Sequence, residues 1–86
     1  MRQKIYEIVK KHIDGYDYMG LLASGCPSDE FDAESGHISE SIRANSSAYE
    51  IAEVIARIFE VYFDNPEEPE RFMELAKRIH QDLTNT

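Results

Sequence analysis

The chain has a single cysteine, no tryptophan and no long uninterrupted hydrophobic stretch. Because Cys26 has no second cysteine with which to pair, the fold cannot depend on an internal disulfide. No apolar run approaches the roughly 20 residues that a membrane-spanning helix needs. The N-terminus alternates charged with aliphatic residues and lacks the apolar segment of a signal peptide. We therefore expect a soluble, cytoplasmic protein that does not insert into a membrane.

Basic residues are also scarce: nine Lys and Arg stand against seventeen Asp and Glu, for a net charge of −8. Nucleic acids and anionic membranes bind through clustered Lys and Arg, so neither is an expected partner. Residues 1–13 carry four bases and one acid, whereas residues 14–70 carry fourteen acids and two bases. The acidic majority can attract a basic protein partner, or it can serve solubility alone. The basic N-terminal helix can lie against the acidic remainder or against a second copy, which leaves a homodimer open.

The 86 residues, 42% of them hydrophobic and 30% charged, fit one small globular domain covering residues 1–86. No segment alternates apolar and polar residues with the period of two that strands require. We therefore predict an all-α fold: a small open bundle of three main helices plus one short helix, with a long ordered loop between the first two.

The clearest helix signal covers residues 47–64, where apolar residues recur at spacings of three and four over about five turns. Ser47 and Glu50 form the pattern of a capping box, which predicts the start of this helix. The end is predicted at Asp64-Asn65-Pro66, because the residue before a proline disfavours the helical conformation.

Three further helices are predicted. The first covers residues 2–14, with Gly15 as its left-handed C-terminal cap. The last covers residues 67–83, and Pro69 in its first turn places the boundary near residue 68. A shorter helix lies between Asp32 and Asn45, with Asp32 as its N-cap.

Residues 15–31 form the loop between the first two helices, and this loop is longer than a simple turn between bundled helices. Its apolar side chains predict an ordered segment packed on the bundle. In one interpretation Leu21 and Leu22 cover an open side of the core. In the other, Tyr16 and Tyr18 face a partner, as tyrosines often do at interfaces.

The same segment contains the run Asp17-Tyr-Met-Gly-Leu-Leu22, followed by Gly25-Cys-Pro-Ser-Asp-Glu-Phe-Asp32 and by Glu34. This pattern resembles that of the bacterial YugE-like family. The chain departs from that pattern at Tyr18, Met19, Cys26 and Phe31. The resemblance implies a small bacterial all-helical protein in an open bundle, and it implies no activity and no catalytic residues.

Four carboxylates occur within six residues, at Asp29, Glu30, Asp32 and Glu34. An EF-hand beginning at Asp32 would need glycine and glutamate at the positions held by His37 and Arg43, so that calcium motif is absent. These carboxylates can instead cap the following helix and complement its dipole, or present an acidic patch to a partner.

The remaining candidates for metal or nucleophilic chemistry are His12, His37, His80 and Cys26. No CxxC, HxxxH or HExxH spacing joins any two of them. We therefore predict no catalytic residue, no metal site and no cofactor. The alternative is a metal-binding protein or small enzyme centred on Cys26 and His37.

The sequence thus favours a non-enzymatic interaction or regulatory module that binds an unidentified, basic protein partner through residues 16–34. A second interpretation is an immunity protein or antitoxin that inhibits a basic toxin. The candidate binding residues are Tyr16, Asp17, Tyr18, Asp29, Glu30 and Asp32.

Overall fold

The computed structural model describes residues 2–26 and 31–85, and all the regular secondary structure in those ranges is helical. The predicted all-α bundle of three main helices and one short helix is confirmed. The elements in chain order are α1 (Arg2–Tyr16), η1 (Tyr18–Gly20), α2 (Asp32–Ser41), α3 (Ala48–Phe63), η2 (Pro69–Phe72) and α4 (Met73–Thr84), where η denotes a 3-10 helix.

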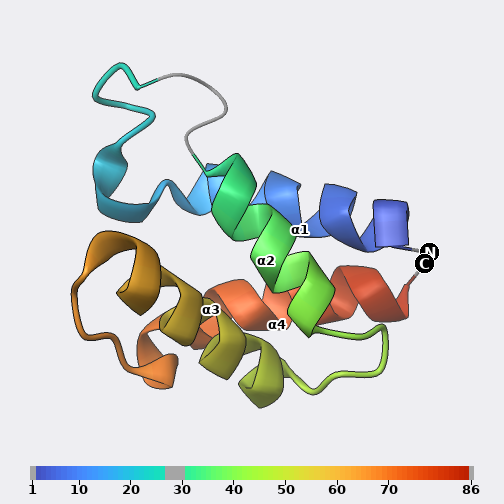
Figure 1. Ribbon diagram of the computed structural model, residues 1–86. Coiled ribbons are helices and arrows are strands. Elements are labelled where there is room, and N and C mark those ends of the chain that lie inside the picture. Colours follow the sequence, from blue (N-terminus) through green and yellow to red (C-terminus); the bar gives the residue numbers. More distant parts are fainter. Residues whose placement is uncertain (1, 27–30, 86) are drawn as a thin grey trace.

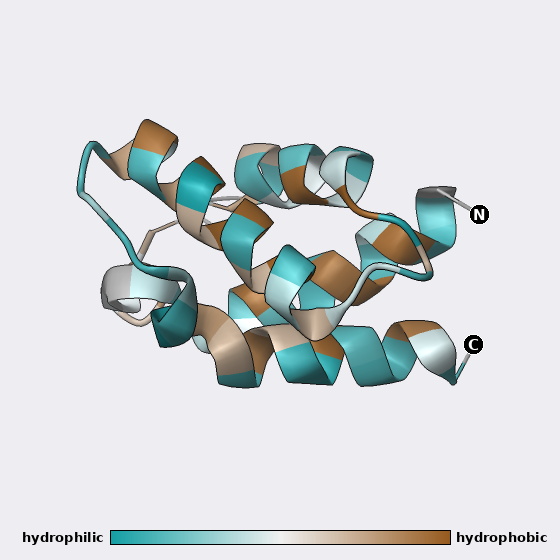
Figure 2. Cartoon of the chain, turned by 90° about the horizontal axis from the view of Figure 1, so that it is seen from below, coloured by the Kyte–Doolittle hydropathy of each residue, from teal (hydrophilic) through white to brown (hydrophobic). Residues whose placement is uncertain are grey.

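The four α-helices surround one hydrophobic core. α1 packs against α2 and α4, while α3 packs against α2, α4 and η2 (Figure 1). The first residues of α1 and the last residues of α4 lie at the same end of the bundle (Figure 1). Apolar bands alternate with polar ones along the helices (Figure 2), as expected of helices that each bury one face. The largest fully buried hydrophobic side chains are Val9, Ile13, Tyr18, Phe31, Ile38, Ile51, Ile55, Phe59, Phe72 and Ile79.

The start of α3 is the capping box that the sequence predicts. The Glu50 amide donates to the Ser47 hydroxyl at 3.1 Å, and the Ser47 amide donates to the Glu50 carboxylate at 2.8 Å. Two amides that have no partner within the helix are thereby satisfied. The helix ends at Phe63, and Asp64 turns the chain away with a left-handed φ of 52°.

The predicted cap of α1 at Gly15 is wrong. The helix continues through Tyr16, and the left-handed residue is Asp17, with φ at 52°. Its carboxylate accepts hydrogen bonds from the amides of Leu22 at 2.7 Å and Ala23 at 3.0 Å. Aspartate tolerates this conformation because its short side chain can bond to nearby backbone groups, and here those bonds hold the start of the loop.

The connection after α1 is ordered as far as the structure describes it. Its first part forms η1, and Leu21 and Leu22 are half-buried against the core. The predicted role of these two leucines as cover for the core is therefore confirmed. Phe31, at the end of the connection, is fully buried against Phe59 and Phe63.

Asp32 does not cap α2 as predicted. The residue before the helix is Phe31, which makes no side-chain capping bond, and Asp32 is already inside the first turn. Its carboxylate accepts a hydrogen bond from Lys10 at 2.6 Å, which ties α2 to α1. The negative charge still complements the dipole of α2 at this position.

The predicted helix over 67–83 divides into two pieces. Pro69 is the first residue of η2, as its fixed φ and missing amide proton favour. The boundary at Glu68 agrees with the prediction, but the regular α-helix begins only at Met73.

The capping box gives a direct test of the fold. Replacing Ser47 with alanine removes the acceptor for the Glu50 amide, so Ser47→Ala should lower the free energy of unfolding by about 1 kcal/mol. Urea denaturation followed by circular dichroism measures the difference. The matched control is Ser41→Ala, at an exposed position on α2, which should change stability by less than about 0.5 kcal/mol. Equal effects of the two substitutions would contradict the capping role.

Candidate functional site

Tyr18, predicted as a partner-facing residue, lies in the core. Its side chain is fully buried, with ring centroids 4.4 Å from Phe59 and 5.0 Å from Phe63. The hydroxyl donates a hydrogen bond to the Glu67 carboxylate. Burial raises the pKa of Tyr18, and the bond to Glu67 raises it further. Tyr18 therefore anchors the loop and cannot contact a partner in this arrangement.

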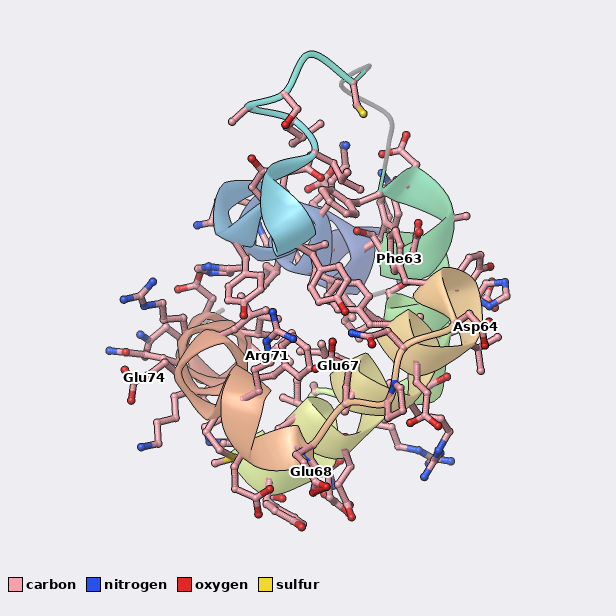
Figure 3. The ribbon with its side chains drawn as sticks, turned by 90° about the vertical axis from the view of Figure 1, so that its left-hand side faces the viewer. Phe63, Asp64, Glu67, Glu68, Arg71 and Glu74 are labelled. Atoms are coloured by element: carbon pink, nitrogen blue, oxygen red, sulfur yellow. The ribbon has the colours of Figure 1, made fainter. Side chains whose placement is uncertain are left out.

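Glu67 receives that bond as an almost buried carboxylate, with its side chain only 3% exposed. Arg71 Nη1 lies 2.7 Å from both carboxylate oxygens, and Asn65 Nδ2 lies 3.2 Å from one of them. Figure 3 shows Glu67 and Arg71 close together at this end of the bundle. Burial alone would raise the pKa of Glu67, but the bonds from Tyr18 and Arg71 outweigh it and hold the pKa below its usual value.

Arg71 completes the network from its more exposed position. Its guanidinium lies 5.2 Å from the ring centroid of Tyr18 and 5.7 Å from that of Phe72, within the range of cation–π attraction. The bond to Glu67, followed by an interaction with the Tyr16 hydroxyl, raises the pKa of Arg71. The network joins the loop after α1 to η2 and the turn before it.

The other predicted loop residues have different environments. Tyr16 is 37% exposed, and its ring centroid lies 5.8 Å from that of Phe72. Asp17 is bonded to loop amides and Asp32 to Lys10. The bonds from Lys10 to Asp14 and Asp32 raise the pKa of Lys10. Asp29 and Glu30 lie outside the described residues. The structure thus assigns internal contacts to Asp17 and Asp32, whose carboxylates hold the loop and the α1–α2 pair.

The histidines and the cysteine are not gathered into a site. Within residues 2–26 and 31–85, no group of three or more His, Cys, Asp and Glu side chains is arranged to hold a metal ion. His12 Nε2 lies 2.7 Å from Asp82, and His80 Nδ1 lies 3.0 Å from the Ser46 carbonyl oxygen. His37 lies against the ring of Tyr62. Cys26 is a half-buried free thiol.

The outward side of α3 is a candidate binding surface. It consists of charged and apolar residues, some exposed and some half-buried, that share one arc of the helix because their positions recur at helical spacing. Val61 is 74% exposed, more than Tyr49 at 47% and Tyr62 at 40%, the other large hydrophobic side chains that α3 exposes. The members of this surface, called the α3 face below, are Glu50, Glu53, Val54, Arg57, Glu60 and Val61.

A hollow of about 420 Å³ continues the α3 face toward α2. Its near wall is formed by members of the α3 face, and its far wall is formed by the connection between α2 and α3, including Arg43 and Asn45. The lining is mainly polar, so the hollow suits polar side chains or a peptide backbone better than a purely apolar ligand.

The helical spacing over residues 47–64 puts Glu50, Glu53, Arg57 and Glu60 opposite the apolar stripe, but it does not single out Val61. The available signal was the position of Val61 on an arc that holds mainly charged residues. A helix that needed only a core-facing stripe would carry a polar residue there.

Searches of protein-family models, curated proteins and solved structures found no match to this chain. Among the helices that the structure describes, none is long and apolar enough to cross a membrane. The resemblance to the YugE-like family therefore stays a prediction.

The buried carboxylate predicts a pH-dependent contribution to stability. Since the folded-state pKa of Glu67 is below its usual value of 4.5, its contribution is complete above that value and is lost as the pH falls through the lower folded pKa. Glu67→Gln should lower the free energy of unfolding at pH 7 by about 1 to 3 kcal/mol, by weakening charged hydrogen bonds.

Urea denaturation at several pH values from neutral to acidic measures both effects. The difference between the native protein and Glu67→Gln should shrink on acidification. Glu68→Gln, which changes the exposed neighbour, is the matched control and should show a small difference at every pH. A constant difference for Glu67→Gln across the range would contradict the assigned network.

Proposed function

We propose that the protein is a non-enzymatic binding module that recognises a basic protein partner through the α3 face. The observation that carries this proposal is the exposure of Val61 beside Glu53 and Glu60 on one helical surface. An apolar contact surrounded by charged residues, here mainly acidic, fits the apolar core and polar rim of a protein interface. The apolar part supplies affinity, and the charges select partners and increase the association rate.

Charge supports a basic partner over an acidic one. The α3 face holds three carboxylates and one guanidinium, and the whole chain carries a net charge of −8. A second acidic protein would be repelled at long range, whereas a basic protein would be attracted. The same repulsion disfavours self-association through this face. A toxin with a basic active-site cleft is one class of partner with the required charge.

The location differs from that expected from the sequence alone. Tyr18 is buried and the carboxylates of Asp17 and Asp32 have partners within the chain. A surface that binds a partner needs side chains that are free to change partners, and the α3 face offers Glu60 and Val61 in exposed positions. We therefore place the binding surface on α3 rather than on residues 16–34.

Affinity capture from a lysate of the source cell, followed by titration calorimetry with the purified partner, tests the proposal. Val61→Asn removes the apolar contact, and Glu53→Gln with Glu60→Gln removes two charges. Each variant should bind about tenfold more weakly, which corresponds to a loss of about 1.4 kcal/mol. The double variant should also show a weaker dependence on salt.

Asp29→Asn with Glu30→Gln is the matched control, because it removes the same number of charges from the predicted loop surface. This control should retain the partner, and circular dichroism of every variant should show the native helical content. Loss of the partner from the control, with retention by both α3 variants, would overturn the assignment of the surface to α3. Failure to capture any stoichiometric partner would overturn the binding module itself.

A further inference from the structure

The chain has two segments with net positive charge, and the fold places them side by side. Residues 1–13 carry four bases and one acid, and residues 71–86 carry three bases and two acids. These segments belong mainly to α1 and α4, which pack against each other (Figure 1). Positive charge is thereby concentrated at one helix pair of an otherwise acidic protein.

A hollow of about 270 Å³ lies between these two helices. Three permanent cations line it, namely Lys11, Arg71 and Arg78, against the single carboxylate of Glu74. This balance is opposite in sign to that of the whole chain. Hollows lined by one sign of charge concentrate the field and attract ligands of the other sign.

The cations differ in how far they are neutralised within the protein. Lys11 lies 3.1 Å from Asp82, and Arg71 is held by Glu67. Among the residues that the structure describes, no carboxylate forms an ion pair with the Arg78 guanidinium. Arg78 therefore has its hydrogen-bond donors available to a ligand, and its planar fork suits a carboxylate or phosphoryl group.

The hollow also has an apolar wall and a neutral donor. Leu75 and the ring of Tyr16 contribute apolar surface, and the Tyr16 hydroxyl lies near Arg71. A small cavity with a few converging polar groups on an apolar wall is the usual form of a ligand site. Its volume exceeds that of a bare inorganic anion, so the wall favours a ligand with an attached organic group.

We infer that the hollow between α1 and α4 binds a small organic anion whose phosphoryl or carboxylate group pairs with Arg78. Arg71 and Lys11, already paired with Glu67 and Asp82, line the hollow beside Arg78, while Leu75 and the Tyr16 ring contact the organic part. This site is separate from the α3 face, and its function does not depend on the proposed protein partner.

NMR titration of the isotope-labelled full chain tests the inference with phenyl phosphate, benzoate and the uncharged analogue benzyl alcohol. One or both anions should give saturable shifts confined to residues 11–16 and 71–78, and benzyl alcohol should give none. If only phenyl phosphate saturates the site, the recognised group is a phosphoryl group. If only benzoate saturates it, the recognised group is a carboxylate. Equal binding of benzyl alcohol would overturn the inference.

Three substitutions at exposed positions sharpen the test. Arg78→Gln should weaken anion binding at least about tenfold, since charged hydrogen bonds are lost. Glu74→Gln removes the one carboxylate from the lining and should strengthen binding. Arg57→Gln makes the same chemical change on α3 and should leave binding unchanged. Equal weakening by Arg78→Gln and Arg57→Gln would show diffuse charge attraction and would overturn the site.

Discussion

The Glu67 carboxylate is the constraint on which much of the arrangement depends. A nearly buried negative charge must be compensated, because leaving it unpaired costs several kcal/mol. Arg71 and Tyr18 supply the compensation from opposite directions in the chain. Pairing with Arg71 fixes η2 against the preceding turn, and pairing with Tyr18 fixes the loop after α1. One carboxylate thus determines where two irregular segments meet the regular bundle.

The parts of this fold that could be predicted from the sequence are governed by local chemistry. The capping box at Ser47, the boundary before Pro69 and the apolar period of α3 each involve residues within a few turns of one another. The hydrogen bond between Tyr18 and Glu67 joins residues 49 positions apart, and no local sequence pattern predicts it. An acidic residue near the start of a helix, such as Glu67, is favoured by the helix dipole alone, so nothing in the sequence indicated its burial.

The exposure of the candidate binding residues was likewise beyond prediction from local sequence patterns. A run of carboxylates is visible in the sequence, but whether each one faces solvent or a lysine depends on how the helices pack. Asp32 meets Lys10 of α1, and Asp17 turns back onto its own loop. The polar arc of α3 could be predicted from the helical period alone. Val61 is exposed because no other helix covers that arc in the part of the chain that the structure describes, and the period does not show this. Exposure of an apolar residue is a property of the packed structure.

The net charge of the chain and the charge of each surface attract different kinds of ligand. The value of −8 describes the field far from the protein, yet charges in physiological salt act over only about 8 Å. The molecule extends 33 × 24 × 19 Å, so its surfaces are wide enough to differ in sign. The α3 face concentrates carboxylates, and the hollow between α1 and α4 concentrates cations. Because the two basic chain ends pack together, an acidic protein can select a basic partner at one surface and an anion at another.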